Sequence, residues 1–208
     1  MKTILYIHGM GGGGDSRIPN YLKKLYLPDT IQVVIRTYDF DPEIGHRQIV
    51  SWVEEVKPDL IIGESLGAIQ ALRIQGIPHL FVSPSLGAPE LLYKAARLTA
   101  FPPFRWFLHY KYPVKEGDRQ KLKFTPEVLR KYKAHGEAAI AAIEPDGYYY
   151  AFFGKHDHYK KSGVVRVDLW ERYFGKTYTE YDGTHFMESE YIEALLIPRI
   201  LQVLGLEK

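Results

Sequence analysis

Short apolar segments alternate with helical segments along this chain, and no other feature constrains its fold as strongly. Six runs rich in β-branched and aromatic residues have the length and composition of buried strands. They span residues 3–8, 31–38, 60–62, 79–82, 148–153 and 176–181. Because strands that alternate with helices usually pair in parallel, the pattern predicts an α/β fold: a three-layer α/β/α sandwich around a parallel sheet of about six strands.

Helices are predicted between these strands and after the last one. In residues 45–56, apolar side chains recur at intervals of three or four and share one helical face: Ile49, Trp52, Val53 and Val56. The other predicted helices span residues 15–25, 65–74, 165–174 and 189–204, with a bend at Pro198 in the last. A chain of 208 residues that is 46% hydrophobic can bury one core, so we expect a single domain over residues 1–208.

The segment between the fourth and fifth predicted strands is far longer than a crossover helix requires. It covers residues 86–147, and its basic residues are concentrated. Between residues 88 and 135, eleven Lys or Arg residues face four acidic ones, a local charge of +7 in a chain whose net charge is +2. We therefore expect an inserted helical cap over residues 88–145.

The motif Gly63-Glu64-Ser65-Leu66-Gly67 lies directly between a predicted strand and a predicted helix. A serine on such a tight turn takes a strained backbone conformation, and glycine two residues away on each side leaves room for it. Its hydroxyl then stands clear at the carboxyl end of the sheet, where reactive groups gather in this architecture. Ser65 is therefore the predicted nucleophile. The alternative is a glycine-rich helix start that buries an inert serine.

A serine nucleophile needs a base within hydrogen-bond reach and an acid that orients the base. His185 follows the last predicted strand, and Asp157 follows the strand before it. Both belong at the same edge of the sheet as Ser65, so we predict that His185 is the base and Asp157 the acid. Asp182 is a second candidate for the acid, although an Asp-Gly pair more often forms a turn.

The glycine-rich turn after the first strand completes the predicted site. The backbone amides of Met10 and Leu66 are expected to hold the oxyanion that forms when Ser65 attacks a carbonyl group. His8 lies so close to the end of the strand that we expect it to have a structural role in the turn, not the role of the general base.

Two other chemistries fit parts of the sequence. Gly9, Gly11 and Gly14 match the G-x-G-x-x-G fingerprint of dinucleotide-binding proteins, but five glycines within six positions make such a match easy. The histidines on either side of Asp157 suggest metal ligands, although no third cluster lies nearby in the sequence. We predict neither a cofactor nor a metal, and a dinucleotide-dependent enzyme is the less favoured alternative.

The chain resembles the α/β-hydrolase superfamily, and within it the small bacterial serine esterases of the YqiA-like type. The likeness runs over nearly the whole chain and rests most on the motif around Ser65 and on the ending Gly183-Thr184-His185-Phe186. It implies a serine, an acid and a histidine in that chain order, the strand order 2-1-3-4-5-6, and a helical segment after the fourth strand that covers the site. The sequence departs from those relatives at Ser83-Pro84-Ser85 and around Asp157, which bears on the substrate more than on the three residues.

Aromatic residues are concentrated in residues 101–112, which contain seven of them when the histidine is counted. One interpretation is that they form the small core of the cap and its seam with the sheet. The other is a substrate-binding wall, in which Phe104 and Trp106 contact an acyl group while Arg105 and Lys111 receive an anionic group. Aromatic and basic residues together also suit a membrane surface, but the sequence gives no clear amphipathic pattern here.

We expect a serine hydrolase that cleaves small-molecule carboxylic esters or thioesters through an acyl-enzyme on Ser65. A peptidase or amidase that uses the same residues is the nearest alternative, and a hydrolase fold that only binds ligands is another. The net charge of +2 gives no sign of nucleic-acid binding, and no apolar run approaches the roughly 20 residues of a membrane span. The absence of cysteine excludes disulfides. Because the apolar stretch at the start is too short for a secretory signal, we expect a cytoplasmic location.

Overall fold

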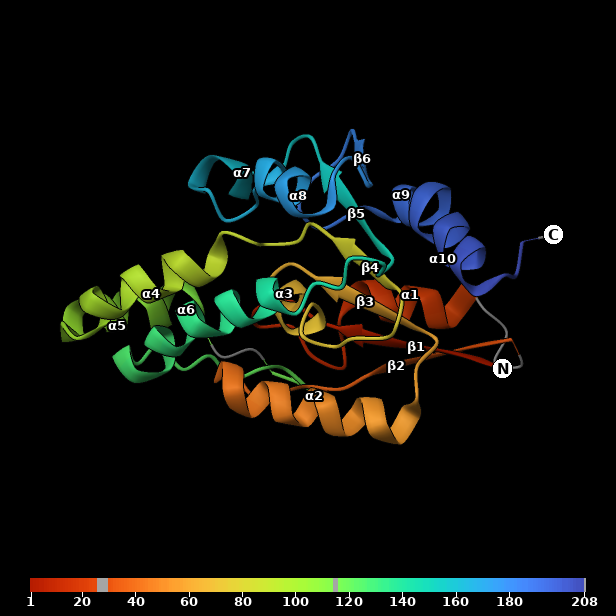
Figure 1. Cartoon of the computed structure of the whole chain (residues 1–208). Helices are drawn as coiled ribbons and strands as arrows, with labels where there is room; N and C mark the ends of the chain where they lie inside the picture. The colour runs from red at the N-terminus through yellow and green to blue at the C-terminus, as the bar shows by residue number, and fades with distance from the viewer. Residues whose placement is uncertain (26–29, 114–115, 208) are drawn as a thin grey trace.

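The structure, a computed structural model, describes residues 1–25, 30–113 and 116–207. At its centre is a six-stranded sheet in which every neighbouring pair is parallel and the order is β2-β1-β3-β4-β5-β6 (Figure 1). The strands are β1 (Lys2–Ile7), β2 (Ile31–Ile35), β3 (Leu60–Glu64), β4 (His79–Val82), β5 (Tyr149–Gly154) and β6 (Tyr178–Tyr181). The predicted α/β architecture and the strand order implied by the family resemblance are confirmed.

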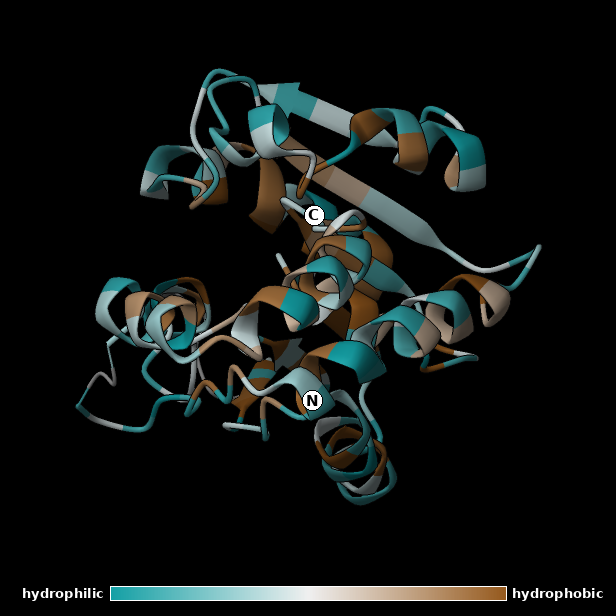
Figure 2. Cartoon of the chain, turned by 90° about the vertical axis from the view of Figure 1, so that its left-hand side faces the viewer, coloured by the Kyte–Doolittle hydropathy of each residue, from teal (hydrophilic) through white to brown (hydrophobic). Residues whose placement is uncertain are grey.

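Helices cover both faces of the sheet (Figure 1). Side chains alternate along each strand, so Leu5 and Ile7 of β1 face one helical layer while Ile4 and Tyr6 face the other. The first layer consists of α2 (Pro42–Val56), α3 (Gly67–Ala71), α4 (Ala88–Thr99), α6 (Pro126–Ala141) and α8 (Val167–Phe174). The second consists of α1 (Arg17–Leu25), α9 (Ser189–Tyr191) and α10 (Ile197–Leu204). Figure 2 shows the apolar strands, in brown, enclosed at the centre.

Some element boundaries differ from the prediction for identifiable reasons. β2 is shorter than predicted. α2 starts earlier than predicted, because the Asp41 carboxylate accepts hydrogen bonds from the amides of Glu43 and Ile44 and so caps the helix there. The predicted last helix is interrupted by a π-helical segment, Ile192–Leu196. That wider turn lies just before Pro198, whose ring and missing amide would break a regular α-helix at this point.

The segment predicted as a cap contains α4, α6 and, between them, α5 (Pro102–Lys111). α4 packs against α6, and α6 also contacts α2 and α3. Leu129 and Tyr132 of α6 are buried in the main core, so this helix belongs to the sandwich as much as to the inserted segment. α5 is different, because it buries none of its ten residues. It lies at the far left of the molecule in Figure 1.

Candidate active site

Ser65 lies on the tight turn that joins β3 to α3. Its backbone has a φ of 51°, in the left-handed region that residues other than glycine adopt only under strain. A Cβ on Gly67 would lie 2.4 Å from the carbonyl oxygens of Ile7 and His8, and a Cβ on Gly63 would lie 3.0 Å from the backbone of α3. Only glycine fits at position 67, and a side chain at position 63 would require its neighbours to shift by a few tenths of an ångström.

The side chains of Ser65, His185 and Asp157 form one hydrogen-bonded series. The Oγ atom of Ser65 lies 2.9 Å from Nε2 of His185, and Nδ1 of His185 lies 2.7 Å from Oδ2 of Asp157. His185 and Asp157 are each 3% exposed, so water does not compete for the bond between them. The structure thus brings together three residues, of which Ser65 and His185 are 120 positions apart in the sequence.

Neighbouring loops hold the histidine and the acid in place. Asp157 follows β5 and His185 follows β6, and a Cβ on Gly154 would lie 2.2 Å from the carbonyl oxygen of Thr184, so a glycine there lets the loops meet. The other carboxylate oxygen of Asp157 accepts a 2.8 Å hydrogen bond from the amide of Tyr159, at the start of α7 (Tyr159–Ser162). The Tyr159 ring also packs against His185 with centroids 4.6 Å apart. These contacts orient both side chains toward Ser65.

Asp182, the second candidate for the acid, contacts His156 and not His185. Its carboxylate lies 2.9 Å from Nε2 of His156, and the two side chains are 71% and 66% exposed. A carboxylate in that surface pair does not orient His185, so the geometry favours Asp157. Within the part of the chain that the structure describes, no three metal-ligating side chains cluster together, at the neighbouring histidines or elsewhere.

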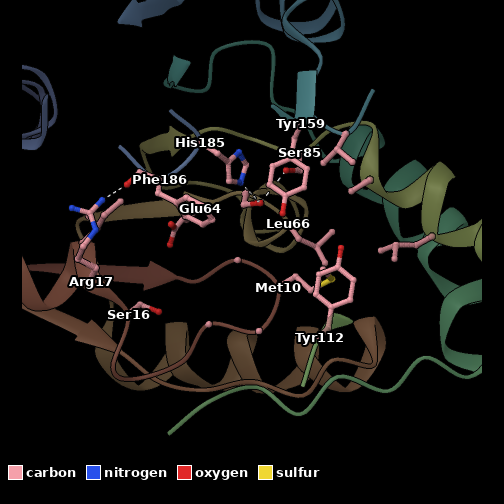
Figure 3. Close-up of a pocket in the computed structure, with 18 of the residues that line it drawn as sticks. Met10, Ser16, Arg17, Glu64, Leu66, Ser85, Tyr112, Tyr159, His185 and Phe186 are labelled. Atoms are coloured by element: carbon pink, nitrogen blue, oxygen red, sulfur yellow. Dashed lines mark hydrogen bonds between the residues drawn. The ribbon is translucent and has the colours of Figure 1, made fainter. Parts of the chain in front are cut away.

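A cavity of about 480 Å³ opens over Ser65. Figure 3 shows Met10 and Tyr112 on one side of it and Ser16 and Arg17 on the other, with His185 between them. The apolar part of the lining comes from several elements and comprises Met10, Leu66, Leu91, Leu92, Val164 and the rings of Tyr112 and Tyr159. Residues from five separate segments therefore converge on the serine, as a ligand site at the carboxyl edge of a parallel sheet requires.

Comparison with known proteins identifies the architecture. No protein-family model matches the chain, and no curated protein matches its sequence. Est1E of Butyrivibrio proteoclasticus, solved with ferulic acid, matches with a TM-score of 0.69 at 15% identity, over 99% of this chain and 90% of that one. A structure from the metagenome-derived lipolytic enzymes LipS and LipT gives 0.62 at 14% identity, over 98% and 93%. An α/β serine hydrolase homologue from Coxiella burnetii gives 0.53 at 14% identity, over 99% and 85%. This chain has the α/β-hydrolase fold.

At these sequence identities the likeness establishes the fold alone. The narrower resemblance to YqiA-like esterases stays a prediction. In this α/β-hydrolase fold, Met10 and Leu66, whose amides were predicted to hold an oxyanion, both line the cavity beside Ser65. Among the hydrogen bonds found between described residues, none uses the amide of Met10 or of Leu66, so both donors are open to a ligand.

A second hydroxyl group, which was not predicted from the sequence, lies beside that of Ser65. The Oγ atom of Ser85 lies 3.0 Å from Oγ of Ser65, and the amide of Ser85 donates to the Ser65 carbonyl oxygen. Ser85 is 1% exposed and lies in the loop after β4, which neighbours β3 in the sheet. That place, at the carboxyl end of an adjacent strand, is the one signal that could have identified it.

The cavity also has a polar end that was not predicted from the sequence. Glu64, the residue before Ser65, lines it, and Tyr6 donates a 2.8 Å hydrogen bond to the Glu64 carboxylate. Burial raises the pKa of Glu64 above its usual value. Arg17 donates to the carbonyl oxygens of Phe186 and Met187, beside His185. Arg119, a further lining residue, pairs with the carboxylate of Asp15. The cavity therefore has one apolar side and one charged side.

The four predicted substrate contacts do not line this cavity and stay a prediction. Phe104, Arg105, Trp106 and Lys111 belong to α5, and none of them is among the residues that line the cavity. Trp106 instead exposes 69% of its surface. The path of the chain explains the difference, because α5 turns away from the sheet and the following residue, Tyr112, is the one that reaches the cavity.

The glycine-rich turn packs closely against the inserted segment. A Cβ on Gly13 would lie 1.8 Å from the carbonyl oxygen of Asp118, and one on Gly14 would lie 2.2 Å from the Asp118 carboxylate. An acidic side chain at this turn opposes the pyrophosphate that the dinucleotide alternative requires. His8 is fully buried, stacks on Tyr38 with centroids 4.3 Å apart, and has its pKa lowered to about 4 by burial. These contacts agree with a structural role for His8.

Proposed function

We propose that this protein is a serine hydrolase of carboxylic esters or thioesters, with Ser65 as nucleophile, His185 as general base and Asp157 as the orienting acid. One observation carries the proposal. Hydrogen bonds of 2.9 Å and 2.7 Å lead without a break from the Ser65 hydroxyl, through the His185 ring, to a buried carboxylate. On a fold that presents a serine at a strained turn, such a series is what activates a hydroxyl group.

The reaction proceeds through an acyl-enzyme. The Ser65 oxygen attacks the carbonyl carbon while Nε2 of His185 takes the hydroxyl proton, and the Asp157 carboxylate stabilises the resulting imidazolium without becoming protonated. His185 then gives the proton to the leaving alcohol or thiol as the C–O or C–S bond breaks. A water molecule, deprotonated by the same histidine, attacks the new ester and releases the carboxylic acid and Ser65.

We assign the oxyanion to the backbone amides of Met10 and Leu66. Both residues line the cavity beside Ser65, and Leu66 is the residue directly after the nucleophile, a position whose amide points toward the reacting carbonyl in this fold. Removing one such donor typically lowers the rate by about 10²–10³-fold. The charge that develops on the substrate oxygen therefore meets backbone donors that need no rearrangement.

The cavity supports small to medium acyl groups as substrates. Its volume of about 480 Å³ lies within the usual range for small-molecule sites, and its apolar side chains surround one approach to Ser65. The named neighbours point the same way, since they include lipolytic enzymes and an enzyme solved with ferulic acid, an aromatic carboxylic acid. Arg17 and Arg119, at the other side, could receive an anionic part of the substrate.

Labelling with a small fluorophosphonate, followed by intact-mass measurement, tests the proposal. We expect one adduct on the parent protein, none on Ser65→Ala and a much slower reaction on His185→Ala. Ser85→Ala is the matched control, because it removes the hydroxyl 3.0 Å from Ser65 Oγ and should still gain the adduct. An unlabelled but folded parent would contradict the proposal and favour a hydrolase fold that only binds ligands. For a labelled parent, hydrolysis rates on an ester and an amide with the same acyl group separate an esterase from an amidase.

A further inference from the structure

The outward side of α5 carries a stripe of exposed apolar residues. Trp106, Phe107 and Tyr110 are 69%, 52% and 86% exposed. With Pro103, these positions are three or four residues apart and so share one side of the helix. We call these four residues the α5 face. Large aromatic side chains are normally buried, and a group of them on one exposed helix marks an interaction surface.

The charged residues in α5 and in the chain around it are all positive. Residues 91–113 contain no acidic residue and four basic ones, Lys94, Arg97, Arg105 and Lys111. Arg97 and Lys111 are exposed, whereas Lys94 pairs with Glu90 one turn away. Aromatic rings take positions at the headgroup level of a bilayer, and nearby cations meet anionic lipid headgroups. The α5 face and its cations have both features.

The helix pair α4 and α5 carries the α5 face and is also connected to the lining of the cavity. Tyr112, the residue after α5, lines the cavity and packs against Phe124 with centroids 5.7 Å apart. Leu91 and Leu92 of α4, the helix before α5, also line it. The C-terminal end of α5 therefore lies beside the apolar side of the cavity.

We propose that the α5 face binds peripherally to the surface of an anionic phospholipid bilayer. A second copy of this chain fits the face less well, because α5 against α5 would bring Arg97, Arg105 and Lys111 of two copies together. Binding here is peripheral: within residues 1–25, 30–113 and 116–207, no helix has the length and hydrophobicity of a membrane span. Membrane binding by this face does not depend on the proposed hydrolase activity.

Co-sedimentation of the full chain with vesicles tests the proposal. We expect binding to vesicles of phosphatidylcholine mixed with phosphatidylserine, weak binding to phosphatidylcholine alone, and weaker binding as salt is raised. The double variant Arg97→Gln with Lys111→Gln should bind the mixed vesicles roughly thirtyfold more weakly, since each cation near an anionic leaflet contributes. Lys23→Gln with Lys24→Gln removes two exposed cations from α1 and is the matched control, expected to bind like the parent.

Tryptophan fluorescence gives a second measurement. Trp170 is buried and Trp52 is half-buried, so a blue shift on adding mixed vesicles reports on Trp106. Trp106→Phe should abolish the shift, and Trp52→Phe should keep it.

Three results would overturn membrane binding by the α5 face. The first is a folded parent that neither sediments nor shifts, and the second is an equal loss of binding in the α5 and α1 double variants. The third is self-association in solution that Trp106→Ser abolishes, without vesicle binding, which would assign the face to a second copy. A failure here leaves the labelling of Ser65 untouched, because neither measurement uses catalysis.

Discussion

Asp157 and Asp182 both follow strands at the edge of the sheet that carries Ser65, yet their surroundings differ. Asp157 is 3% exposed and bonded to Nδ1 of His185, whereas Asp182 lies at the surface beside His156. We expect Asp157→Asn to lower kcat for ester hydrolysis about 10⁴-fold while the protein stays folded, because the amide favours the wrong histidine tautomer. Asp182→Asn is the matched control and should keep turnover near the parent rate. Steady-state kinetics and thermal unfolding of both variants measure this, and nearly normal turnover in Asp157→Asn would remove it from the mechanism.

Single residues were predictable where a strand end fixed them. Ser65, Asp157 and His185 each follow a predicted strand, and parallel strands bring such positions to one edge. No glycine motif surrounds Ser85 to indicate that it belongs to the site. Arg17 reaches the cavity only because α1 starts beside it. The sequence could not show that Phe104, Arg105, Trp106 and Lys111 lie outside the cavity lining, because composition tells what a segment contains and not which way it turns.

At the scale of elements, one carboxylate both caps α2 and ties it to α6. Asp41 accepts hydrogen bonds from the Glu43 and Ile44 amides and from Lys131 of α6, the last at 2.6 Å. Burial alone would raise the pKa of Asp41, but Lys131 and the amides hold it below its usual value. Asp41→Ala should lower the free energy of unfolding by about 1 kcal/mol through loss of the cap. Asp41→Asn, which can still cap the helix, should lower it less.

The effect of Asp41 on stability should depend on pH in a defined direction. Because its pKa is lower in the folded protein, its stabilisation is complete above the pKa of the unfolded chain, about 4, and is lost as pH falls through the folded value. Urea unfolding at about pH 7 and about pH 3 measures the difference between parent and Asp41→Asn. That difference should shrink at the lower pH, and an equal difference at both would contradict the assignment.

The sequence predicts strands better than it predicts the boundaries of helices. The four central strands were found because buried parallel strands are short, nearly continuous apolar runs. The edge strands β2 and β6 are less buried and were found from their β-branched and aromatic residues. Helix ends were less predictable, since Asp41 and Pro42 start α2 through a local cap and not through periodicity. The π-helical segment Ile192–Leu196 depends on how the chain relieves the strain at Pro198 while packing against the sheet, which no spacing rule contains.

For the whole molecule, three buried histidines make stability sensitive to mild acid. His8, His79 and His135 are at most 4% exposed. Burial lowers the pKa of His8 and of His79 to about 4, and burial together with Arg73 lowers that of His135 to about 3. In the unfolded chain these rings take up protons near about pH 6.5. As pH falls below that value, the unfolded state binds more protons, and each histidine lowers the free energy of unfolding by up to about 1.4 kcal/mol per pH unit until its folded pKa is reached.

Urea unfolding between about pH 7 and about pH 4.5 should therefore show stability falling steeply toward the acid side. His79 stacks against Phe81 and Tyr149, so His79→Phe keeps an aromatic ring there while removing one group that takes up a proton. This variant should lose stability less steeply, by up to about 1.4 kcal/mol per pH unit, whatever its stability at neutral pH. His109→Gln, at an exposed position on α5, is the matched control and should follow the parent slope. A slope in His79→Phe equal to that of the parent would mean that His79 is not kept neutral by the fold, and that the acid sensitivity arises elsewhere in the molecule.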